Sequence, residues 1–161
     1  MDFGIYTSFN GRINRAKYWL ASIILVVVFI ALLLIGTVFV VGIFRGEFTY
    51  RVWLSADDPL VFLMNFVLKL LVLYPWAALT VKRLHDRNRS GYFAAFILVP
   101  SIILAITDIL GITGSETFNW IDGVLGGLLL VVTIWFFIEL GCLRGTVGKN
   151  QYGADPLAEN A

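Results

Sequence analysis

Four long apolar segments, separated by polar connectors, dominate the pattern of the sequence. They cover residues 18–44, 60–81, 91–107 and 123–143, and the first contains 27 consecutive uncharged residues. A helix of about 20 apolar residues crosses the hydrocarbon core of a bilayer. No segment alternates apolar and polar residues as a strand does, and backbone groups in hydrocarbon must be hydrogen-bonded within the protein. The pattern therefore predicts an all-α integral membrane protein, with one domain over 1–161 forming a four-helix transmembrane bundle.

Proline and serine residues mark where the predicted helices begin and bend. Pro59 follows two acidic residues and suits the first turn of the second helix, where its missing N–H costs no hydrogen bond. Ser90 is placed to cap the third helix, because its hydroxyl can accept from a free N–H of the first turn. Pro75 falls inside the second segment, where it predicts a kink, and Pro100 falls inside the third.

The basic residues predict the orientation in the membrane. Three precede the first segment, four lie in 82–90 and two follow the last segment, whereas the other two connectors hold two and none. Short loops rich in lysine and arginine stay on the cytoplasmic side. We therefore expect residues 1–17, 82–90 and 144–161 to be cytoplasmic, so that both termini face the same side.

The composition excludes several classes of protein. A chain that is 59% hydrophobic and 14% charged is too apolar for a soluble domain of this length. One cysteine, Cys142, excludes an intramolecular disulfide, and a single histidine without paired cysteines excludes the usual zinc sites. We therefore predict no metal and no cofactor.

A short internal similarity links the starts of the first and third segments. Residues 14–21 read NRAKYWLA and residues 88–95 read NRSGYFAA, and the two align without gaps. One hypothesis is that the protein consists of two parallel helical hairpins related by a pseudo-twofold axis along the membrane normal. The alternative is convergence, because any cytoplasmic start of a membrane helix favours basic residues followed by aromatic ones.

Three motifs occur in order along the chain and carry a family resemblance. They are GRxxR at 11–15 followed by Tyr18 and Trp19, RLHD at 83–86 with SGY at 90–92 and Pro100, and GTxGxNxYGxDP at 145–156. With these motifs the chain resembles the bacterial inner-membrane family catalogued as domain of unknown function 805. The resemblance covers nearly the whole chain. It implies a small, multi-spanning protein of the bacterial inner membrane, and the family carries no established activity.

The chain departs from the usual family pattern at three places. Arg87, Asn88 and Arg89 make the central connector more basic than the family's small residues, Tyr92 stands where tryptophan is common, and Lys149 stands where proline is frequent. These departures leave the resemblance in fold intact.

The distinctive polar residues fall in the segments predicted to be cytoplasmic. One interpretation is that they fix topology and touch phospholipids, each basic residue contributing about 1 kcal/mol near an anionic surface. The other is that the motifs pack into one cap, in which Asp86 takes an arginine partner and Asn150 and Tyr152 close over it. Such a cap could bind an anionic lipid head or a partner protein. The candidate cap residues are Arg12, Arg15, Arg83, His85, Asp86, Arg89, Asn150 and Tyr152.

His85, Asp86 and Ser90 also raise the question of a catalytic triad. A carboxylate that follows its histidine directly in sequence rarely reaches the imidazole in the orienting geometry, and no oxyanion hole is recognisable. We therefore predict no catalysis and interpret His85 as a structural or pH-sensitive interfacial residue. The basic connector lies next to two membrane segments, so lipid rather than nucleic acid is its expected partner.

Lys69 and Glu139 are the ionisable residues inside the predicted spans. Lys69 lies twelve residues before Val81, about 18 Å along a helix, whereas Glu139 is only about 6 Å from Leu143. Glu139 can therefore reach the interface or meet an arginine there. Lys69 lies near mid-bilayer, where a charge is costly, and it either snorkels or faces a polar cleft lined by residues such as Asn65 and Thr133.

The sequence thus favours a membrane interaction or scaffold protein that acts through its basic cytoplasmic cap. Its expected partners are anionic lipid headgroups and either another membrane protein or a second copy of the chain. The alternative is a small transporter or channel subunit that uses Lys69, which would need oligomerisation because four spans offer little room for a pathway. An intramembrane enzyme is less favoured, since the spans lack a convincing nucleophile and base.

Overall fold

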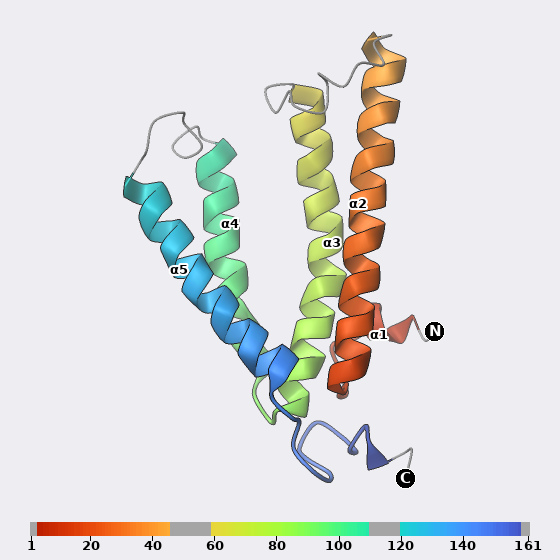
Figure 1. Ribbon diagram of the computed structural model, residues 1–161, viewed down its shortest axis with the longest axis vertical. Helices are drawn as coiled ribbons and strands as arrows, with labels where there is room; N and C mark the ends of the chain where they lie inside the picture. Colours follow the sequence, from red (N-terminus) through yellow and green to blue (C-terminus); the bar gives the residue numbers. More distant parts are fainter. Residues whose placement is uncertain (1–2, 46–58, 110–119, 159–161) are drawn as a thin grey trace. The chain divides into compact units, whose positions relative to one another are not determined.

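The computed structural model describes residues 3–45, 59–109 and 120–158, and this part of the chain is helical apart from turns and one isolated β-bridge. Figure 1 shows the order of the helices, with α1 and α2 in red and orange and α5 in blue. The elements are α1 (Gly4–Thr7), α2 (Arg15–Arg45), α3 (Pro59–Asp86), the 3₁₀ turn η2 (Gly91–Ala94), α4 (Ala95–Ile109), α5 (Trp120–Phe136) and its π-helical continuation η3 (Phe137–Cys142).

All four apolar segments form helices, as the sequence predicts. By length and composition, three stretches are able to cross a membrane: Arg15–Gly36, Leu63–Asp86 and Gly123–Cys142. The apolar stretch Gly91–Ile103 is shorter, so within the described residues three candidate spans are shown and the fourth is not.

Several predicted helix signals are confirmed. Pro59 is the first residue of α3, and the Ser90 hydroxyl accepts a hydrogen bond from the Tyr92 N–H at 3.3 Å. Pro75 and Pro100 lie inside α3 and α4. The helix ends differ from the predicted segments by one to three residues at several places, and the largest difference is at α3, which continues through the RLHD motif to Asp86 rather than ending at Val81. The connector to η2 is therefore only a tight turn.

The chain divides into two compact units, which are described separately. The first comprises Met1–Ser8 and Trp19–Leu79, and the second comprises Phe9–Tyr18 and Thr80–Ala161. In the first unit, α2 and α3 approach closely at Gly36, where an added Cβ would lie 2.7 Å from the Met64 sulfur. The Tyr74 hydroxyl donates to the Thr7 carbonyl at 2.8 Å and ties the end of α1 to α3.

The core of the second unit lies where α3, η2 and η3 meet. Leu84, Ala94, Phe136 and Leu140 are buried together. Trp135 packs edge-on against Phe136, with 4.9 Å between ring centroids. Because Leu84 is fully buried in this cluster, its neighbours in the RLHD motif are held against the end of η3.

The two starts that resemble each other in sequence are built differently. Asn14 caps α2 directly, since its side-chain oxygen accepts the Lys17 N–H at 2.8 Å. Its counterpart Asn88 adopts a left-handed backbone with φ of 56°, and Ser90 provides the cap instead. The relation of two helical hairpins by a pseudo-twofold axis stays a prediction. The aligned residues Asn14 and Asn88 have different local roles.

The turn after α3 has the hydrogen bonds of a Schellman motif. The Arg89 N–H donates to the Leu84 carbonyl at 2.9 Å, and the Asn88 N–H donates to the His85 carbonyl at 3.0 Å. This motif needs a residue with a left-handed backbone just after the helix. Glycine is the commonest residue at this position, and asparagine is the next most common. The turn reverses the chain from α3 into η2 within four residues.

Replacing Asn88 should show this requirement. Asn88→Ala should lower the free energy of unfolding by about 1 kcal/mol, because a Cβ-bearing residue without a side-chain amide is disfavoured in the left-handed region. Asn88→Gly should leave it unchanged or raise it. Thermal unfolding in a mild detergent measures both variants, and equal melting temperatures for alanine and glycine would contradict a left-handed residue 88.

Candidate functional site

A buried carboxylate, Asp86, lies at the centre of the polar residues of the second unit. Asp86 is only 3% exposed to solvent. Arg12 donates to Oδ1 through Nε at 3.1 Å and Nη2 at 3.0 Å, and Arg83 donates to Oδ2 through Nη1. We call these three residues the arginine–aspartate cluster. A buried carboxylate needs such charge-assisted partners, because a lone charge out of water is strongly unfavourable.

Arg83 joins this cluster to the end of η3. It lies three residues before Asp86 on α3, so both side chains share one face of the helix. Its Nε donates to the Leu140 carbonyl at 2.7 Å, and its Nη2 donates to the Leu143 carbonyl. The last carbonyls of a helix lack intrahelical partners and carry partial negative charge. A fully buried guanidinium therefore satisfies them.

Arg12 joins the cluster to the C-terminal tail, defined here as residues 144–157. Its Nη2 donates to the Thr146 carbonyl at 2.6 Å. Its Nη1 donates to the Gly148 carbonyl at 2.7 Å and lies 3.3 Å from that of Gly153. The side chain is 1% exposed. One arginine thus holds three carbonyl groups of the tail and the carboxylate together.

The tail in turn satisfies the free carbonyls at the end of α3. Thr146 donates to the Asp86 carbonyl through its N–H at 2.8 Å and its hydroxyl at 3.0 Å. The Asn150 amide donates to the His85 carbonyl and to the Thr146 hydroxyl, each at 2.9 Å. The Tyr152 N–H donates back to the Asn150 side-chain oxygen at 2.8 Å. These bonds explain why α3 can continue to Asp86.

Gly145 allows the tail to approach this closely. A Cβ added at Gly145 would lie 1.9 Å from Asp86 Oδ2, which is far inside any permitted contact. The carboxylate itself cannot move aside, because Arg12 and Arg83 hold it from both oxygens. Glycine is therefore the residue that fits here.

His85 belongs to the same assembly but has separate partners. Its ring stacks on Tyr152 with 3.8 Å between centroids and 5° between planes. Its Nδ1 lies 3.3 Å from the Gly11 carbonyl, so Nδ1 carries the proton in this contact. Asp86 is directed to the arginines and Ser90 to Tyr92. The three side chains therefore do not form a hydrogen-bonded triad.

Glu139 forms a second buried ionic contact, at the start of η3. The residue is 5% exposed, and its Oε1 accepts from Arg87 Nε at 3.2 Å and Arg89 Nε at 3.0 Å. Of the two interpretations of Glu139, the structure shows the one with arginine partners. We call these three residues the glutamate cluster. Lys69 is not part of it, and lies exposed on α3 in the first unit.

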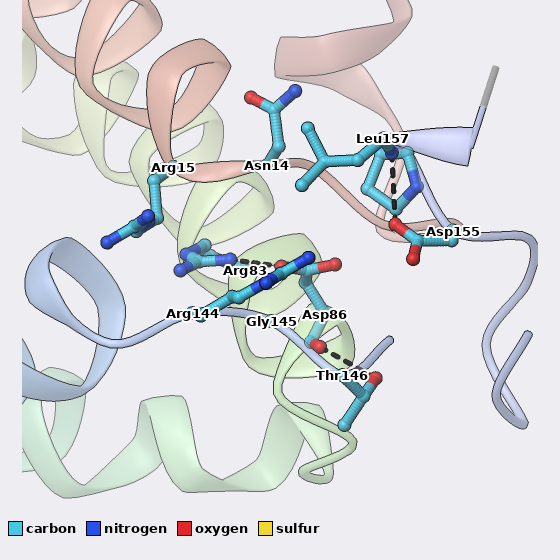
Figure 2. A pocket seen from close by; sticks show the side chains of 10 residues that line it. Asn14, Arg15, Arg83, Asp86, Arg144, Gly145, Thr146, Asp155 and Leu157 are labelled. Atoms are coloured by element: carbon cyan, nitrogen blue, oxygen red, sulfur yellow. Dashed lines mark hydrogen bonds and ion pairs between the residues drawn. The ribbon is translucent and has the colours of Figure 1, made fainter. Parts of the chain in front are cut away.

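Together these residues form a cap, defined here as residues 9–18, 80–90 and 137–157 of the second unit. Figure 2 shows a small pocket within it, with Arg15 and Arg83 on one side and Asp155 and Leu157 of the tail on the other. Its volume of about 30 Å³ has room for about one water molecule. The backbone N–H groups of Leu157 and Gly148, hydrogen-bonded to its carboxylate, hold the pKa of Asp155 below its usual range.

The cap directs its acidic and basic residues differently. Asp86 and Glu139 are buried in contact with arginines. Basic residues with exposed side chains remain on the outside, and within the described part of the cap they are Arg15, Lys17, Arg89, Arg144 and Lys149. Asp155 of the tail is half-buried, so the five exposed basic residues make the outer surface of the cap mainly basic.

The structure brings together most of the cap residues chosen from the sequence. Arg12, Arg83, Asp86, His85, Asn150 and Tyr152 form one connected group. Arg15 donates to the Cys142 carbonyl at 2.8 Å and lines the pocket, whereas Arg89 joins Glu139. The sequence interpretation missed Gly145, Thr146 and Arg87 as site residues. Gly145 and Thr146 belong to the GTxGxNxYGxDP motif, and this motif was the sequence feature that could have identified them.

The described residues offer no group of three or more histidine, cysteine, aspartate or glutamate side chains that could hold a metal ion. The donors of the cap include several guanidinium and backbone N–H groups. These groups bind carboxylates and phosphates rather than cations.

Comparison with known proteins identifies relatives along nearly the whole chain. Residues 6–154 match the family described as "Protein of unknown function (DUF805)". "Uncharacterized protein YiiR" of Escherichia coli K12 is 33% identical over 148 residues, which cover 92% of this chain and 85% of the relative. "Inner membrane protein YhaH" of the same organism is 28% identical, covering 96% and 91%. "Inner membrane protein YhaI" is 29% identical, covering 94% and 87%. No solved structure matches the chain.

Removing the central carboxylate should unfold the cap. Asp86→Ala leaves two buried guanidinium groups without their anion, and breaking a buried ion pair in this way costs about 3–5 kcal/mol. Asp155→Ala is the matched control, because it removes a carboxylate of the same cap that binds only backbone N–H groups. Thermal unfolding in detergent should show a large loss for Asp86→Ala alone, and equal melting temperatures for the two variants would contradict the arginine–aspartate cluster.

Gly145→Ala should release the tail without deleting any polar group. The added methyl collides with the Asp86 carboxylate, so Thr146 can no longer reach the end of α3. Limited proteolysis of the detergent-solubilised protein should then cut within the tail much faster than in the unmodified chain. Val147→Ala serves as the control, since Val147 is 75% exposed. Equal cleavage rates for the two variants would show that Gly145 is not needed for docking.

Proposed function

The chain belongs to this membrane-protein family of unknown function, and from that premise we propose that it is an interaction protein of the bacterial inner membrane that acts through its cap. In this role the cap lies on the cytoplasmic side and contacts the anionic headgroups of the leaflet. Both termini are then cytoplasmic, and the chain crosses the membrane four times. It catalyses no reaction and binds no nucleic acid.

The dimensions of the third helical segment support four crossings. Residues Gly91–Ala94 form a 3₁₀ turn of 4 residues, and α4 adds 15 more without a break. At about 2.0 Å per residue for the 3₁₀ turn and 1.5 Å for the α-helix, the segment is roughly 30 Å long. That length equals the thickness of a typical hydrocarbon core, about 30 Å.

One observation carries the proposal, namely that two of the cap's acids, Asp86 and Glu139, are buried against arginines while five of its basic residues are exposed. The exposed basic residues reach the surface from the start of α2, from the turn after α3 and from the tail. Each basic residue near an anionic leaflet contributes about 1 kcal/mol of attraction. Because Asp86 and Glu139 are enclosed by arginines, they do not oppose this attraction at the surface.

The rigid construction of the cap supports a binding role rather than topology alone. The buried hydrogen bonds of Arg12, Arg83 and Asn150 fix the tail on the end of α3. A preformed surface loses less conformational entropy when it binds than a flexible tail does. Another membrane protein or a second copy of the chain could use the same surface, and either is the alternative occupant to lipid.

Lys69 favours a second candidate function. Its side chain is exposed on α3, inside the candidate span Leu63–Asp86. An ionised lysine at the centre of a membrane helix costs about 2.5–3.5 kcal/mol or more, so it is expected to face a polar partner. A small transporter or channel subunit, assembled from several copies, would provide that partner.

The lipid proposal predicts which basic residues retain anionic lipid. The double variant Arg144→Gln, Lys149→Gln should carry fewer phosphatidylglycerol molecules out of a mixed bilayer into a mild detergent than the unmodified protein, as counted by native mass spectrometry. The matched control Arg45→Gln, Arg51→Gln also removes two basic residues, but from the connector predicted to lie on the opposite side.

Equal lipid retention by the two double variants would contradict a lipid-binding cap. Retention of a stoichiometric protein partner that only Arg144→Gln, Lys149→Gln loses would instead make a protein the occupant. A homo-oligomer that dissociates on Lys69→Leu, with lipid retention unchanged by the cap variant, would favour the transport alternative.

A further inference from the structure

An apolar groove runs along the second unit between η2, α4 and α5. Its volume is about 540 Å³, within the range of roughly 300–1,000 Å³ that is typical of ligand sites. Aromatic and aliphatic side chains form its walls, and among them are Tyr92, Phe93, Phe96, Val99, Leu128 and Val132. Its polar surface is negligible, so the ligand that fits it is a hydrocarbon.

The floor of this groove is firmly packed, while its walls are open. Phe93 lies against Trp135 with 6.3 Å between ring centroids, and Trp135 lies against the buried Phe136. Phe96, Val99 and Leu128 are 59%, 51% and 50% exposed. The groove therefore has a packed floor, and its walls are open to the surrounding medium.

Its surroundings decide what fills the groove. The segments that line it are those proposed to cross the membrane, so the medium around it is acyl chains. Water would need two to four polar partners there, and an empty groove would forfeit the dispersion contacts of its lining. A lipid acyl chain is thus the apolar group that is present around the groove and is able to fill it.

A guanidinium group lies at the end of the groove nearest the cap. The Arg89 guanidinium carbon is 5.6 Å from the centre of the Phe93 ring, and Phe93 is one of the lining residues. Arg89 donates through Nε to Glu139 and its side chain is 44% exposed. Within the described residues the Arg89 side chain makes its hydrogen bond through Nε. Its two terminal nitrogens therefore remain able to donate to a phosphate.

The charge at this end of the groove favours an anion. Glu139 shares one carboxylate oxygen between Arg87 and Arg89, so the glutamate cluster keeps one positive charge in excess. Arg89 is also the more exposed of the two arginines, with 44% of its side chain accessible against 24%. A ligand that joins a phosphate to a long apolar chain matches both parts of the site.

We propose that this groove binds one anionic glycerophospholipid, with an acyl chain along α4 and α5 and the phosphate held by Arg89. Because the ligand is a lipid, the site rests on the proposed function and deepens it, but no residue of the tail lines the groove. A helix of a second copy would fill the apolar part, but it would supply no anion for the excess positive charge of the glutamate cluster. A phospholipid fills the apolar groove with its acyl chain and supplies the anion with its phosphate.

The test uses the full-length protein in nanodiscs that contain phosphatidylglycerol with a photoreactive diazirine in its acyl chain. After irradiation, peptide mass spectrometry should locate the crosslinks at residues 92–100 and 128–132. Leu128→Trp and Val99→Trp each fill the groove and should lower the crosslinking yield there about tenfold, whereas Val131→Trp should not. Val131 is a control on α5 that is 66% exposed and does not line the groove.

Arg89 is tested in the same experiment. Arg89→Gln should lower the crosslinking of phosphatidylglycerol in the groove about tenfold, the effect of one charge-assisted hydrogen bond. Arg51→Gln, in the connector predicted to lie on the opposite side of the membrane, should leave it unchanged. Thermal unfolding establishes that each variant is folded. The two tryptophan substitutions lie on different helices, so if one variant does not fold, the other still tests the groove.

The outcomes separate this site from the proposed function. Crosslinks spread evenly over the exposed faces of α4 and α5, unaffected by the tryptophan variants, would overturn the groove site. Crosslinks in the groove that persist in Arg89→Gln would overturn the assignment of the phosphate. If groove labelling is as expected while Arg144→Gln, Lys149→Gln loses no lipid, the groove site stands and the lipid-binding tail does not.

Discussion

The structure of the second unit depends on the neutralisation of one buried carboxylate. Asp86 has left water almost completely, and such a charge is tolerated only when charge-assisted hydrogen bonds replace its hydration. Its two arginine partners come from the start of the chain and from its own helix. Because Arg12 also holds the tail and Arg83 also holds the end of η3, three distant segments are joined at this point. Removing Asp86 leaves both guanidinium groups buried without their anion, and removing either arginine leaves the carboxylate with one charged partner instead of two.

This arrangement separates two roles that basic residues near a membrane usually share. Counting lysine and arginine predicts which side of the bilayer a loop faces, whatever each side chain contacts. In this protein Arg12 and Arg83 are enclosed within the cap, so they are not able to touch a headgroup. The residues that remain exposed, such as Arg144 and Lys149, are the ones to which the proposed function assigns headgroup contact. A basic residue in a motif is therefore not by itself a sign of ligand contact.

The sequence predicted those features that depend on neighbours along the chain. Apolar runs, Pro59 and Ser90 act within one or two turns, and each is found where its local chemistry places it. The meeting of the motifs was a hypothesis that needed partners 74 and 134 residues apart, and the pattern alone could not choose between it and simple lipid contact. The extension of α3 to Asp86 was missed, because the tail that satisfies its last carbonyls is distant in sequence. The need for glycine at 145 follows from a three-dimensional approach to Asp86 and has no local signature.

The two ionic clusters of the cap have the same composition, and this has an electrostatic consequence. Each places two guanidinium groups around one carboxylate, so each keeps one positive charge after its internal pairing. Charges in a low-dielectric surrounding are screened less than those on a solvated surface. The excess charge of buried or half-buried clusters therefore acts on an approaching anion more strongly than a free lysine does. Arg89 is the member of either cluster that is most exposed, with 44% of its side chain accessible. An anionic headgroup that reaches the cap thus meets the uncompensated charge at Arg89, beside the apolar groove between η2, α4 and α5.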